Sequence, residues 1–181
     1  MTIDVIEVVD YDPSWPGRAA EAVAELREAL PGLFVETEHV GSTSVPGLAA
    51  KPVIDLMVSV AALADVTPER AAVLERLGYR YERTGMRERF FYYREDDAGR
   101  RTHHLHIVTV ASWDTRHERL FSDHLRRHPE TAAEYATLKR SIAAEESDGL
   151  AYTKRKSDLI QLVVDRERTA RGLPHGTLWE E

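Results

Sequence analysis

The stretch HVGSTSVPGLAAKPVIDLMVSV, residues 39–60, is the feature that most constrains the fold of this chain. It begins with a Gly-Ser turn, passes through a Pro-Gly bend and ends in an apolar run that holds one carboxylate, Asp55. Residues 52–60 are apolar at both alternating positions, which is typical of a strand buried on both faces. We therefore expect a central strand that carries Asp55 and follows a Gly-Ser loop with a short helical turn.

The pattern along the rest of the chain predicts strands mixed with helices, followed by three helices. Besides 52–60, strand patterns lie at 33–40, 79–83, 89–95 and 102–110, and 3–9 is expected to form a short strand or arm. Helix patterns lie at 14–30, 67–77, 112–128, from 129 onward and at about 152–171, with Ser14 and Ser112 as expected caps. This order indicates the α+β class, with a sheet core over about 1–111, a helical part over about 112–172 and a flexible tail at 173–181. We expect residues 1–172 to form one domain.

Composition and charge narrow the class of function. The chain has 181 residues and a net charge of −7, which disfavours nucleic acid as a partner, because nonspecific binding relies on a basic surface. There is no cysteine, which excludes disulfides, thiolate metal sites and a cysteine nucleophile. No apolar run approaches the ~18 residues of a membrane span, so no membrane partner and a cytoplasmic location are expected. The sequence specifies no oligomeric state.

The Gly-Ser loop is neither of the common phosphate-binding motifs. Five residues separate Gly41 from Gly47 and no Gly-Lys-Ser follows, so it is not a P-loop, and GxGxxG is absent. One interpretation is that Ser42 and the loop amides hold the phosphates of a triphosphate, with Asp55 on a rigid strand holding Mg²⁺. The other is a tight turn followed by an aspartate that backbone amides satisfy. The spacing does not decide between them.

The segment RTHHLHIVTV, residues 101–110, provides a second group of candidates. His104 and His106 lie on one face of the expected strand, where they can converge on an ion or a phosphate, or act as acid or base near neutral pH. Arg89 on the neighbouring strand can reach a bound phosphate with its planar guanidinium. The alternatives are hydrogen-bonded histidines at a strand end and an arginine in a surface ion pair.

Three further residues are candidates for the same cleft. Lys51 ends the loop and can meet phosphate, or it is a solvated lysine. Tyr152 and Lys156 are four residues apart on a helix and share a face, so they can close the cleft from the C-terminal part. Alternatively, Tyr152 docks its helix onto the rest of the molecule.

Two other histidine patterns carry less weight. The segment from His117 begins like HExxH, but Phe121 occupies the place of the second histidine. His124 and His128 are one helical turn apart and can bind a metal. They lie beside arginines near a helix end, where a histidine also favours the helix dipole, so we assign no site there.

The chain resembles the GrpB family of the nucleotidyltransferase-like superfamily over roughly residues 8–165. The resemblance is carried by YDPSWP at 11–16, EHVGSTSVPGLAAKPVID at 38–55, RFF at 89–91, HLH at 104–106, HPE at 128–130 with EY at 134–135, and AY at 151–152 followed by Lys156. It implies a nucleotidyltransferase-like mixed sheet with flanking helices. It also implies that Gly41, Ser42 and Thr43 belong to the substrate-binding loop and that Asp55 matches the second acid of the strand.

The chain departs from the superfamily pattern at two positions. The first strand acid should stand at residue 53, which is Val53, and the strand expected to carry the third acid carries His104 and His106. One aspartate with two histidines is a poor Mg²⁺ site and suits Zn²⁺, Mn²⁺ or another transition metal better, although it can also bind an anion without a metal. The family also occurs fused to dephospho-CoA kinase, which implies nucleotide or CoA-related metabolism.

Three functions remain open from the sequence. In the first, a nucleotidyltransferase-like enzyme binds a nucleoside triphosphate with a divalent metal, with Asp55, His104 and His106 as the catalytic and metal residues, and transfers to an unidentified acceptor. In the second, a non-catalytic module binds a nucleotide or a CoA-like ligand. In the third, weaker one, a hydrolase uses a histidine-held metal. Each predicts a small phosphorylated ligand rather than a nucleic acid.

Overall fold

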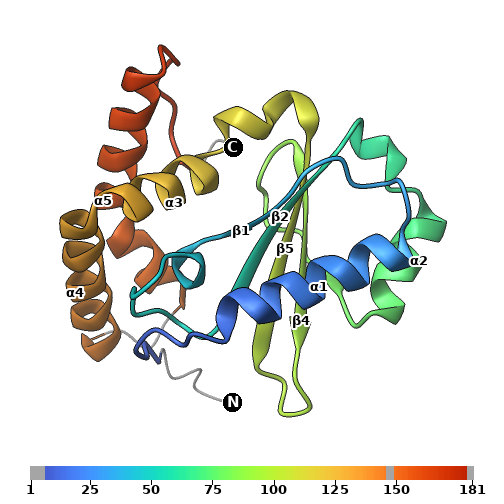
Figure 1. The fold of residues 1–181 in the computed structure, drawn as a ribbon, viewed down its shortest axis with the longest axis horizontal. Coiled ribbons are helices and arrows are strands. Elements are labelled where there is room, and N and C mark those ends of the chain that lie inside the picture. Colours follow the sequence, from blue (N-terminus) through green and yellow to red (C-terminus); the bar gives the residue numbers. More distant parts are fainter. Residues whose placement is uncertain (1–6, 146–148, 179–181) are drawn as a thin grey trace.

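The computed structural model describes residues 7–145 and 149–178, and its centre is a five-stranded mixed sheet (Figure 1). The strand order is β1-β2-β5-β4-β3, with β2 parallel to β5 and the other neighbours antiparallel. The strands are β1 (Thr37–Val40), β2 (Ile54–Val60), β3 (Arg80–Tyr81), β4 (Arg89–Glu95) and β5 (Arg101–Thr109). The strand that carries Asp55 therefore has a neighbour on each side, as its apolar pattern predicted.

The helices divide into two groups. The α-helices are α1 (Trp15–Ala29), α2 (Pro68–Arg76), α3 (His117–Arg127), α4 (Pro129–Glu145) and α5 (Gly149–Ala170), and the short 3₁₀ helices are η1 (Ser42–Ser44), η2 (Leu63–Asp65) and η3 (Val110–Thr115). In Figure 1, α1 crosses the sheet, whereas α3, α4 and α5 gather beyond the β1 edge. The α+β class with a helical C-terminal part is confirmed.

One face of the sheet is an apolar core that α1 covers. Alternate residues of β2 and β5 point to this face and pack against the apolar stripe of α1: Ile54, Leu56, Val58, Val60, Leu105 and Ile107 against Trp15, Ala19, Ala22 and Leu26. Each fully buried side chain of this size stabilises the fold by about 1.5–3 kcal/mol. This face carries most of the apolar core, with the polar residues Arg94 and His103 at its margin, where Arg94 is paired with Glu25 of α1 at 2.7 Å.

The opposite face carries the chemistry. Asp55 is paired in register with His104, and Met57 with His106, because β2 and β5 run parallel. Val40, Met57, Val108 and Trp113 form a small apolar cluster beside these polar side chains. The loop between β1 and β2 then packs through Val45 and Leu48 against α3, α4 and α5, in a second core that includes Leu120, Phe121, Leu125, Tyr135, Val163 and Val164.

Several element ends differ from the sequence-based expectation. The first strand begins at Thr37 rather than at 33, because Leu33 and Phe34 turn into the α1 core instead of joining the sheet. The strand expected at 79–83 has only two residues, Arg80–Tyr81. The strand expected at 102–110 runs from Arg101 to Thr109, and α5 begins at Gly149, ahead of the expected 152.

Neither expected serine cap makes the expected bond. Ser112 lies within η3, where its hydroxyl donates to the Thr109 carbonyl at 3.1 Å and accepts from Arg116, so α3 begins only at His117. At α1 the Ser14 side chain makes no capping bond, and the Ser14 amide instead donates to Asp12 at 2.8 Å. Both serines therefore stabilise turns before a helix.

The ends of the chain are described in part. Of the expected 3–9 strand, residues 3–6 lie outside the described residues, while Val9 forms a single antiparallel bridge with Ala50. Of the expected tail, residues 173–178 are described, and the amides of Leu173 and Leu178 donate to Arg168 and Gln161 at 2.8 and 3.1 Å. The division into a domain at 1–172 and a tail stays a prediction. Within residues 7–145 and 149–178, no helix is both long and apolar enough to cross a membrane.

Candidate functional site

The Gly-Ser loop is built directly over Asp55. Gly41 adopts φ +73°, a conformation that favours glycine, and a Cβ placed there would lie 2.4 Å from Asp55 Oδ2. The loop then turns as η1, and the Ser44 hydroxyl donates to the Gly41 carbonyl at 2.6 Å. Only glycine lets the loop approach the carboxylate this closely, which explains why the glycine and the strand acid occur together.

Asp55 and His104 form a hydrogen-bonded pair across β2 and β5. His104 Nδ1 lies 2.9 Å from Asp55 Oδ1, and since a carboxylate only accepts, the proton belongs on Nδ1. His104 Nε2 is buried and has no hydrogen-bond partner among the described residues. Burial raises the pKa of Asp55, but the hydrogen bond and the neighbouring histidines outweigh it, so the net pKa lies below its usual range. Asp55 is therefore a carboxylate at neutral pH, with its side chain 28% exposed.

Lys139 of α4 also reaches the loop, a contact that the sequence analysis missed. Its amine donates to Ser42 Oγ at 2.9 Å and to the Ala49 carbonyl at 2.5 Å, and the residue is only 2% exposed. The amine also lies 4.6 Å from the centre of the Tyr135 ring. Burial lowers the pKa of Lys139 to about 7. A lysine of this kind is close to losing its charge, and a nearby anion would restore it.

Lys156 of α5 repeats this arrangement. Its amine lies 4.1 Å from the centre of the Tyr152 ring, and the Tyr152 hydroxyl is buried without a hydrogen-bond partner in the described part of the chain. Burial, followed by repulsion from Lys51, lowers the pKa of Lys156 to about 8, and Asp55 opposes the shift. The expected shared face of Tyr152 and Lys156 is present, and Lys51 and Asp55 are near enough to influence the amine.

A repeated sequence motif could have identified Lys139 as a candidate site residue. Tyr135 and Lys139 have the same spacing as Tyr152 and Lys156, Tyr-x₃-Lys, on consecutive helices. A lysine one turn after a buried tyrosine lies on the apolar face of its helix, where it needs a partner. The sequence analysis named Tyr135 only as part of the family resemblance and passed over the lysine four residues later.

Arg89 and His106 form a separate, buried cluster. The Arg89 side chain is 0% exposed and donates to Glu118 of α3, and its Nη1 lies 3.1 Å from His106 Nδ1. Burial raises the pKa of Glu118, but His117 and Arg89 more than offset this and hold it well below its usual range. Arg89 is thus in a buried ion pair, which corrects the alternative of an ion pair at the surface, while its contact with a phosphate stays a prediction.

His106 is not placed as a metal ligand. A guanidinium only donates, so His106 Nδ1 accepts from Arg89 and the remaining proton belongs on Nε2. Burial, reinforced by Arg89 and only partly opposed by Glu118, lowers the pKa of His106 to about 4, so the ring is neutral. Nδ1 is therefore committed to Arg89, and the His106 ring packs against Phe91, whose ring centre lies 5.0 Å away.

Thr43 is a structural part of the loop. It is 1% exposed, its hydroxyl donates to the Val53 carbonyl at 3.2 Å, and His39 Nε2 lies 2.8 Å from the same oxygen. Burial lowers the pKa of His39 to about 4, which keeps the ring neutral. The Thr43 side chain therefore contacts Val53 and His39, and its expected contact with a substrate stays a prediction.

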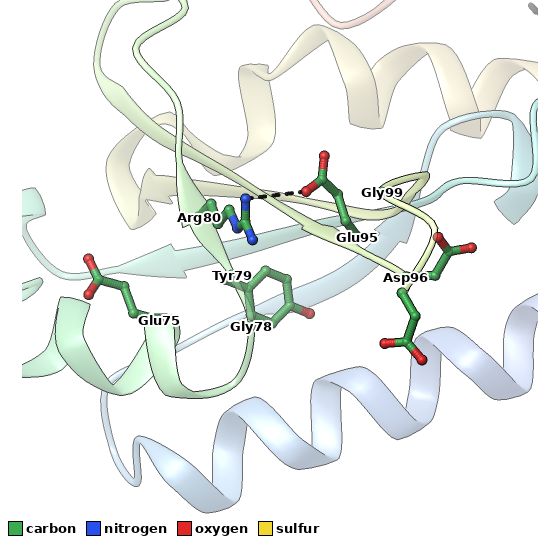
Figure 2. Close-up of a pocket in the computed structure, with 8 residues that line it drawn as sticks. Glu75, Gly78, Tyr79, Arg80, Glu95, Asp96 and Gly99 are labelled. Atoms are coloured by element: carbon green, nitrogen blue, oxygen red, sulfur yellow. Dashed lines mark ion pairs between the residues drawn. The ribbon is translucent and has the colours of Figure 1, made fainter. Parts of the chain in front are cut away.

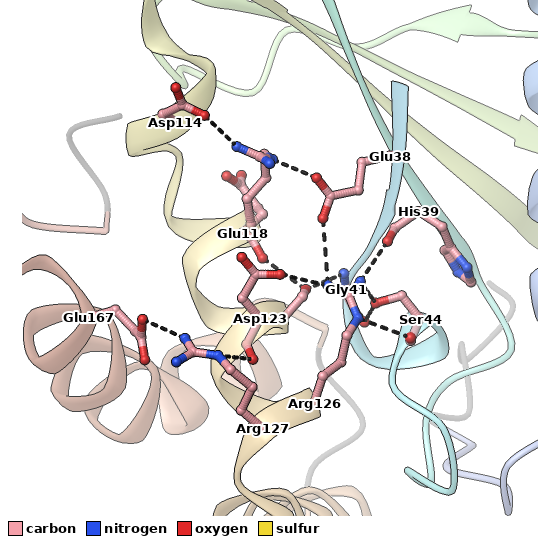
Figure 3. A network of polar contacts seen from close by, with 12 residues as sticks. Glu38, His39, Gly41, Ser44, Asp114, Glu118, Asp123, Arg126, Arg127 and Glu167 are labelled. Atoms are coloured by element: carbon pink, nitrogen blue, oxygen red, sulfur yellow. Dashed lines mark hydrogen bonds and ion pairs between the residues drawn. The ribbon is translucent and has the colours of Figure 1, made fainter. Parts of the chain in front are cut away.

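Helix α3 holds the loop from outside (Figure 3). Arg126 Nη2 donates to the His39 carbonyl and to Ser44 Oγ, each at 3.0 Å, and the Gly41 amide donates to Ser122 Oγ at 2.9 Å. The loop is thus fixed on one side by the strand acid and on the other by the helical part. None of these α3 residues was among the sequence-based candidates.

The side chains around Asp55 do not fit the two-metal magnesium centre that the superfamily implies. Such a centre takes several carboxylates, because Mg²⁺ prefers oxygen ligands. Val53, at the place of the first acid, is 9% exposed and apolar, and His106 is committed to Arg89. Asp55 with His104 Nε2 offers at most one mixed pair of ligands. We therefore derive no step that runs through magnesium.

A separate hollow of about 820 Å³ lies beside β3 and the β4–β5 turn (Figure 2). Its lining includes no predicted site residue and is mainly acidic, with Glu75, Glu95, Asp96 and Asp97. Glu95 is paired with Arg80 at 3.5 Å, and Asp96 accepts from Arg100 at 2.9 Å. Its acidic lining does not suit a phosphorylated ligand, so the Asp55 face is the better candidate.

Comparison with known folds supports this assignment of the architecture. The chain is similar to the structure titled GLD-2/RNP-8 complex, with 12% identity and a TM-score of 0.56 over 88% of this chain and 61% of that one. At this identity the likeness shows the fold alone. The nucleotidyltransferase-like mixed sheet with flanking helices is confirmed.

Closer relatives identify the family. A UPF0157 protein from Pseudomonas aeruginosa is 39% identical over 94% of this chain and 71% of its own length. A dephospho-CoA kinase from Mycolicibacterium paratuberculosis is 33% identical over 80% of this chain, which corresponds to 41% of that protein. The crystal structure of conserved protein GrpB from Enterococcus faecalis has 31% identity and a TM-score of 0.78, over 92% of this chain and 99% of that chain. The GrpB protein family model matches residues 5–166, and the chain belongs to the GrpB family.

Proposed function

We propose that this protein binds the phosphate groups of a nucleotide at the Gly-Ser loop and transfers a nucleotidyl group to an acceptor hydroxyl. The observation that carries the proposal is the convergence of Lys139 and Lys156 on the loop that covers Asp55. Burying two amines from different helices, each over a tyrosine ring, costs free energy unless an anion neutralises their charge. The phosphates of a nucleotide supply that charge.

The lysines take the role that metal ions have in related chemistry. A phosphate bound at Ser42 meets the Lys139 amine, which is already 2.9 Å from that hydroxyl, and Lys156 lies near enough to Lys51 and Asp55 for their charges to shift its pKa. Preorganised positive charge in a site with little water stabilises the charge that develops on a leaving pyrophosphate. Arg89 has no part in this, because Glu118 holds it within the protein.

Asp55 is the group placed to orient and deprotonate the acceptor hydroxyl. Its Oδ1 is held by His104, which fixes the carboxylate, and Oδ2 lies over Gly41 at the loop. In the step, the acceptor oxygen forms a bond to the α-phosphorus, the bond to the β-phosphate oxygen breaks, and pyrophosphate leaves. The acceptor proton passes to Asp55. Positioning and general base action of this kind contribute roughly 10²–10⁴-fold to a rate.

The proposal makes a thermal-unfolding experiment decisive. The protein is measured with ATP, CTP, GTP, UTP or CoA, each with Mg²⁺, Mn²⁺, Zn²⁺ or EDTA. A ligand present at ~100 times its dissociation constant adds about 2.7 kcal/mol to the free energy of unfolding. We expect a shift with a nucleotide that persists in EDTA and is lost in Lys139→Met. Lys154→Met is the matched control, because Lys154 is an exposed lysine two residues before Lys156.

The pH dependence of binding provides an independent check. Phosphate raises the pKa of Lys139 from about 7 toward its ordinary value, so binding takes up a proton above pH 7. The affinity therefore falls as pH rises from about 7 to 9, by up to about tenfold per pH unit for one lysine. An affinity that is flat over this range, or equal in Lys139→Met, contradicts the proposed phosphate site.

A non-catalytic ligand-binding module is the second candidate, and Val53 favours it. The buried valine replaces the first acid of the strand and accepts no metal or proton. A module of this kind retains the lysines and binds a nucleotide or CoA-like ligand without turnover. Incubation of the protein with labelled triphosphates and hydroxyl acceptors separates the two functions. Transfer that Asp55→Asn abolishes, with nucleotide binding retained, supports the enzyme, and binding without transfer supports the module.

A further inference from the structure

A second histidine pair lies where α3 ends and α4 begins, outside the loop site. The rings of His124 and His128 are stacked, with their centres 4.0 Å apart and their planes inclined by 30°. The side chain of His124 is 8% exposed, whereas that of His128 is 40% exposed. The sequence spacing identifies no third metal ligand for this pair, whereas the fold places one beside it.

The third side chain is Glu167, which comes from α5. One ligand atom each from His124, His128 and Glu167 lie within 4.8 Å of one another. Glu167 Oε1 is 2.8 Å from His124 Nδ1, and the carboxylate is only 8% exposed. Its other oxygen, Oε2, accepts from Arg127 at 2.8 Å and from Arg171 at 3.4 Å. The two carboxylate oxygens are thus divided, with Oε1 turned toward the histidines and Oε2 toward the arginines.

We propose that His124, His128 and Glu167 bind one Zn²⁺ or a similar transition-metal ion. Two imidazoles and one carboxylate are a donor set that suits Zn²⁺, with water in the remaining position. Ligand atoms around a tetrahedral zinc are about 3.3–3.5 Å apart, so His124 Nδ1 and Glu167 Oε1, which are 2.8 Å apart, have to separate slightly, and the His128 ring has to adjust to the same spacing. The half-exposed His128 ring is the member that is free to make this movement. The ion then takes the place of the proton between His124 and Glu167.

The surrounding charges are compatible with a bound cation. Arg127 and Arg171 hold Glu167 Oε2 and so orient Oε1, as outer-shell partners of metal-bound carboxylates do. Glu130 lies 3.4 Å from His128 Nδ1, and Asp123 pairs with Arg126 at 2.9 Å and with Arg171 at 3.5 Å. The three carboxylates and three arginines nearly cancel. An added divalent ion therefore meets no net positive field.

The location gives the ion a structural consequence. It ties the end of α3 and the start of α4 to α5 (Figure 3 shows Arg127 of α3 turned toward Glu167 of α5). Helices α4 and α5 carry Lys139 and Lys156, and α3 carries Arg126, which holds the Gly-Ser loop. An ion here fixes the helices relative to one another without entering the loop site. The inference does not depend on which ligand the loop binds.

The experiment uses the full-length protein without a histidine tag, freed of metal by dialysis against EDTA. Zn²⁺ binding is titrated calorimetrically, Co²⁺ binding is followed by its visible absorption, and bound metal is counted by mass spectrometry. The test variant is His128→Ala, whose half-exposed position tolerates truncation, and thermal unfolding without metal checks that it is folded. His175→Ala is the control for loss of an exposed histidine outside the cluster, and Asp55→Asn is the control for the loop site.

We expect one Zn²⁺ per chain in the wild type, the His175→Ala variant and the Asp55→Asn variant, with at least tenfold weaker binding in His128→Ala. Glu167→Gln should weaken binding similarly if it folds. Equal affinity in wild type and His128→Ala overturns the proposal, as does the absence of stoichiometric metal. Loss of the ion in Asp55→Asn alone also overturns it, because the ion then sits at the sheet.

Discussion

The two histidine pairs of this chain meet different partners in the fold. His104 and His106, on β5, lie near the strand acid and were the expected ion ligands, yet only His104 contacts Asp55, while His106 is held by Arg89. His124, on α3, and His128, directly after its end, were given no site, yet Glu167 arrives from α5 with one oxygen turned toward them. Two histidines on one face are therefore only half of a metal site.

The difference lies in the third partner of each pair. An arginine and a carboxylate each fix the tautomer of a neighbouring histidine, but the arginine repels a cation, whereas the carboxylate attracts one. Glu118 and Glu167 both carry negative charge, but Glu118 Oε1 is bonded to Arg89, whereas Glu167 Oε1 lies 2.8 Å from His124 Nδ1 and only its Oε2 is bonded to arginines. The identity of the third side chain decides the chemistry of each histidine pair. Three predictions test the contacts that hold the loop site and its surroundings.

The largest expected effect is that of Arg89→Met. It leaves Glu118 buried without its main counter-ion, and breaking a buried pair from one side costs about 3–5 kcal/mol in the free energy of unfolding. It also releases His106 Nδ1. Urea denaturation measures the change, and Arg87→Met, at an exposed arginine in the preceding loop, is the control. A loss below about 1 kcal/mol would mean that Arg89 is not what fixes His106.

A smaller effect is expected when the loop is pushed away from Asp55. Gly41→Ala combines a strained φ of +73° with a Cβ only 2.4 Å from the carboxylate, and should lower the free energy of unfolding by about 2–4 kcal/mol. Gly47→Ala is matched, since its φ is +78° but nothing lies within 4 Å of the added Cβ. Denaturation curves of the two variants isolate the close approach. Equal losses would show that the loop does not rest on Asp55.

The smallest expected effect for one step of the measurement is a rise in stability with each pH unit in the ligand-free protein. The pKa of Lys139 is about 7 when folded and about 10.4 when unfolded, so between these values the unfolded state binds the extra proton. The free energy of unfolding therefore rises from about pH 7 upward, by at most about 1.4 kcal/mol per pH unit for this lysine. Below pH 7 both states are protonated and the contribution is constant.

Urea denaturation at intervals from pH 6 to 9.5 measures this slope. Lys139→Met should flatten it, while Lys154→Met should leave it unchanged, because Lys154 is exposed. A slope that survives in Lys139→Met would place the titrating group elsewhere. The same pair of variants separates the loop site from the α3–α5 cluster, since neither lysine lies near Glu167 in any described contact.

Much of the fold was predictable from local pattern. The run 52–60 indicated a buried strand, which the structure has at Ile54–Val60, whereas the close approach of Gly41 to Asp55 became visible only in the fold. The short helical turn in the Gly-Ser loop also followed from its sequence. Element ends were less predictable, because Leu33, Phe34 and Ser112 take conformations that tertiary packing and local side-chain bonds select.

By itself, the sequence determined the alternation of strands and helices, the place of the carboxylate on the strand and the family of the chain. Those features depend on local spacing, which a single segment contains. Only the tertiary structure decided that Lys139 reaches Ser42 across 97 positions, that Arg89 belongs to Glu118, and that Glu167 completes the second histidine pair. A charged side chain in the interior is governed by the partner that is closest in space, and folding, not spacing, brings that partner.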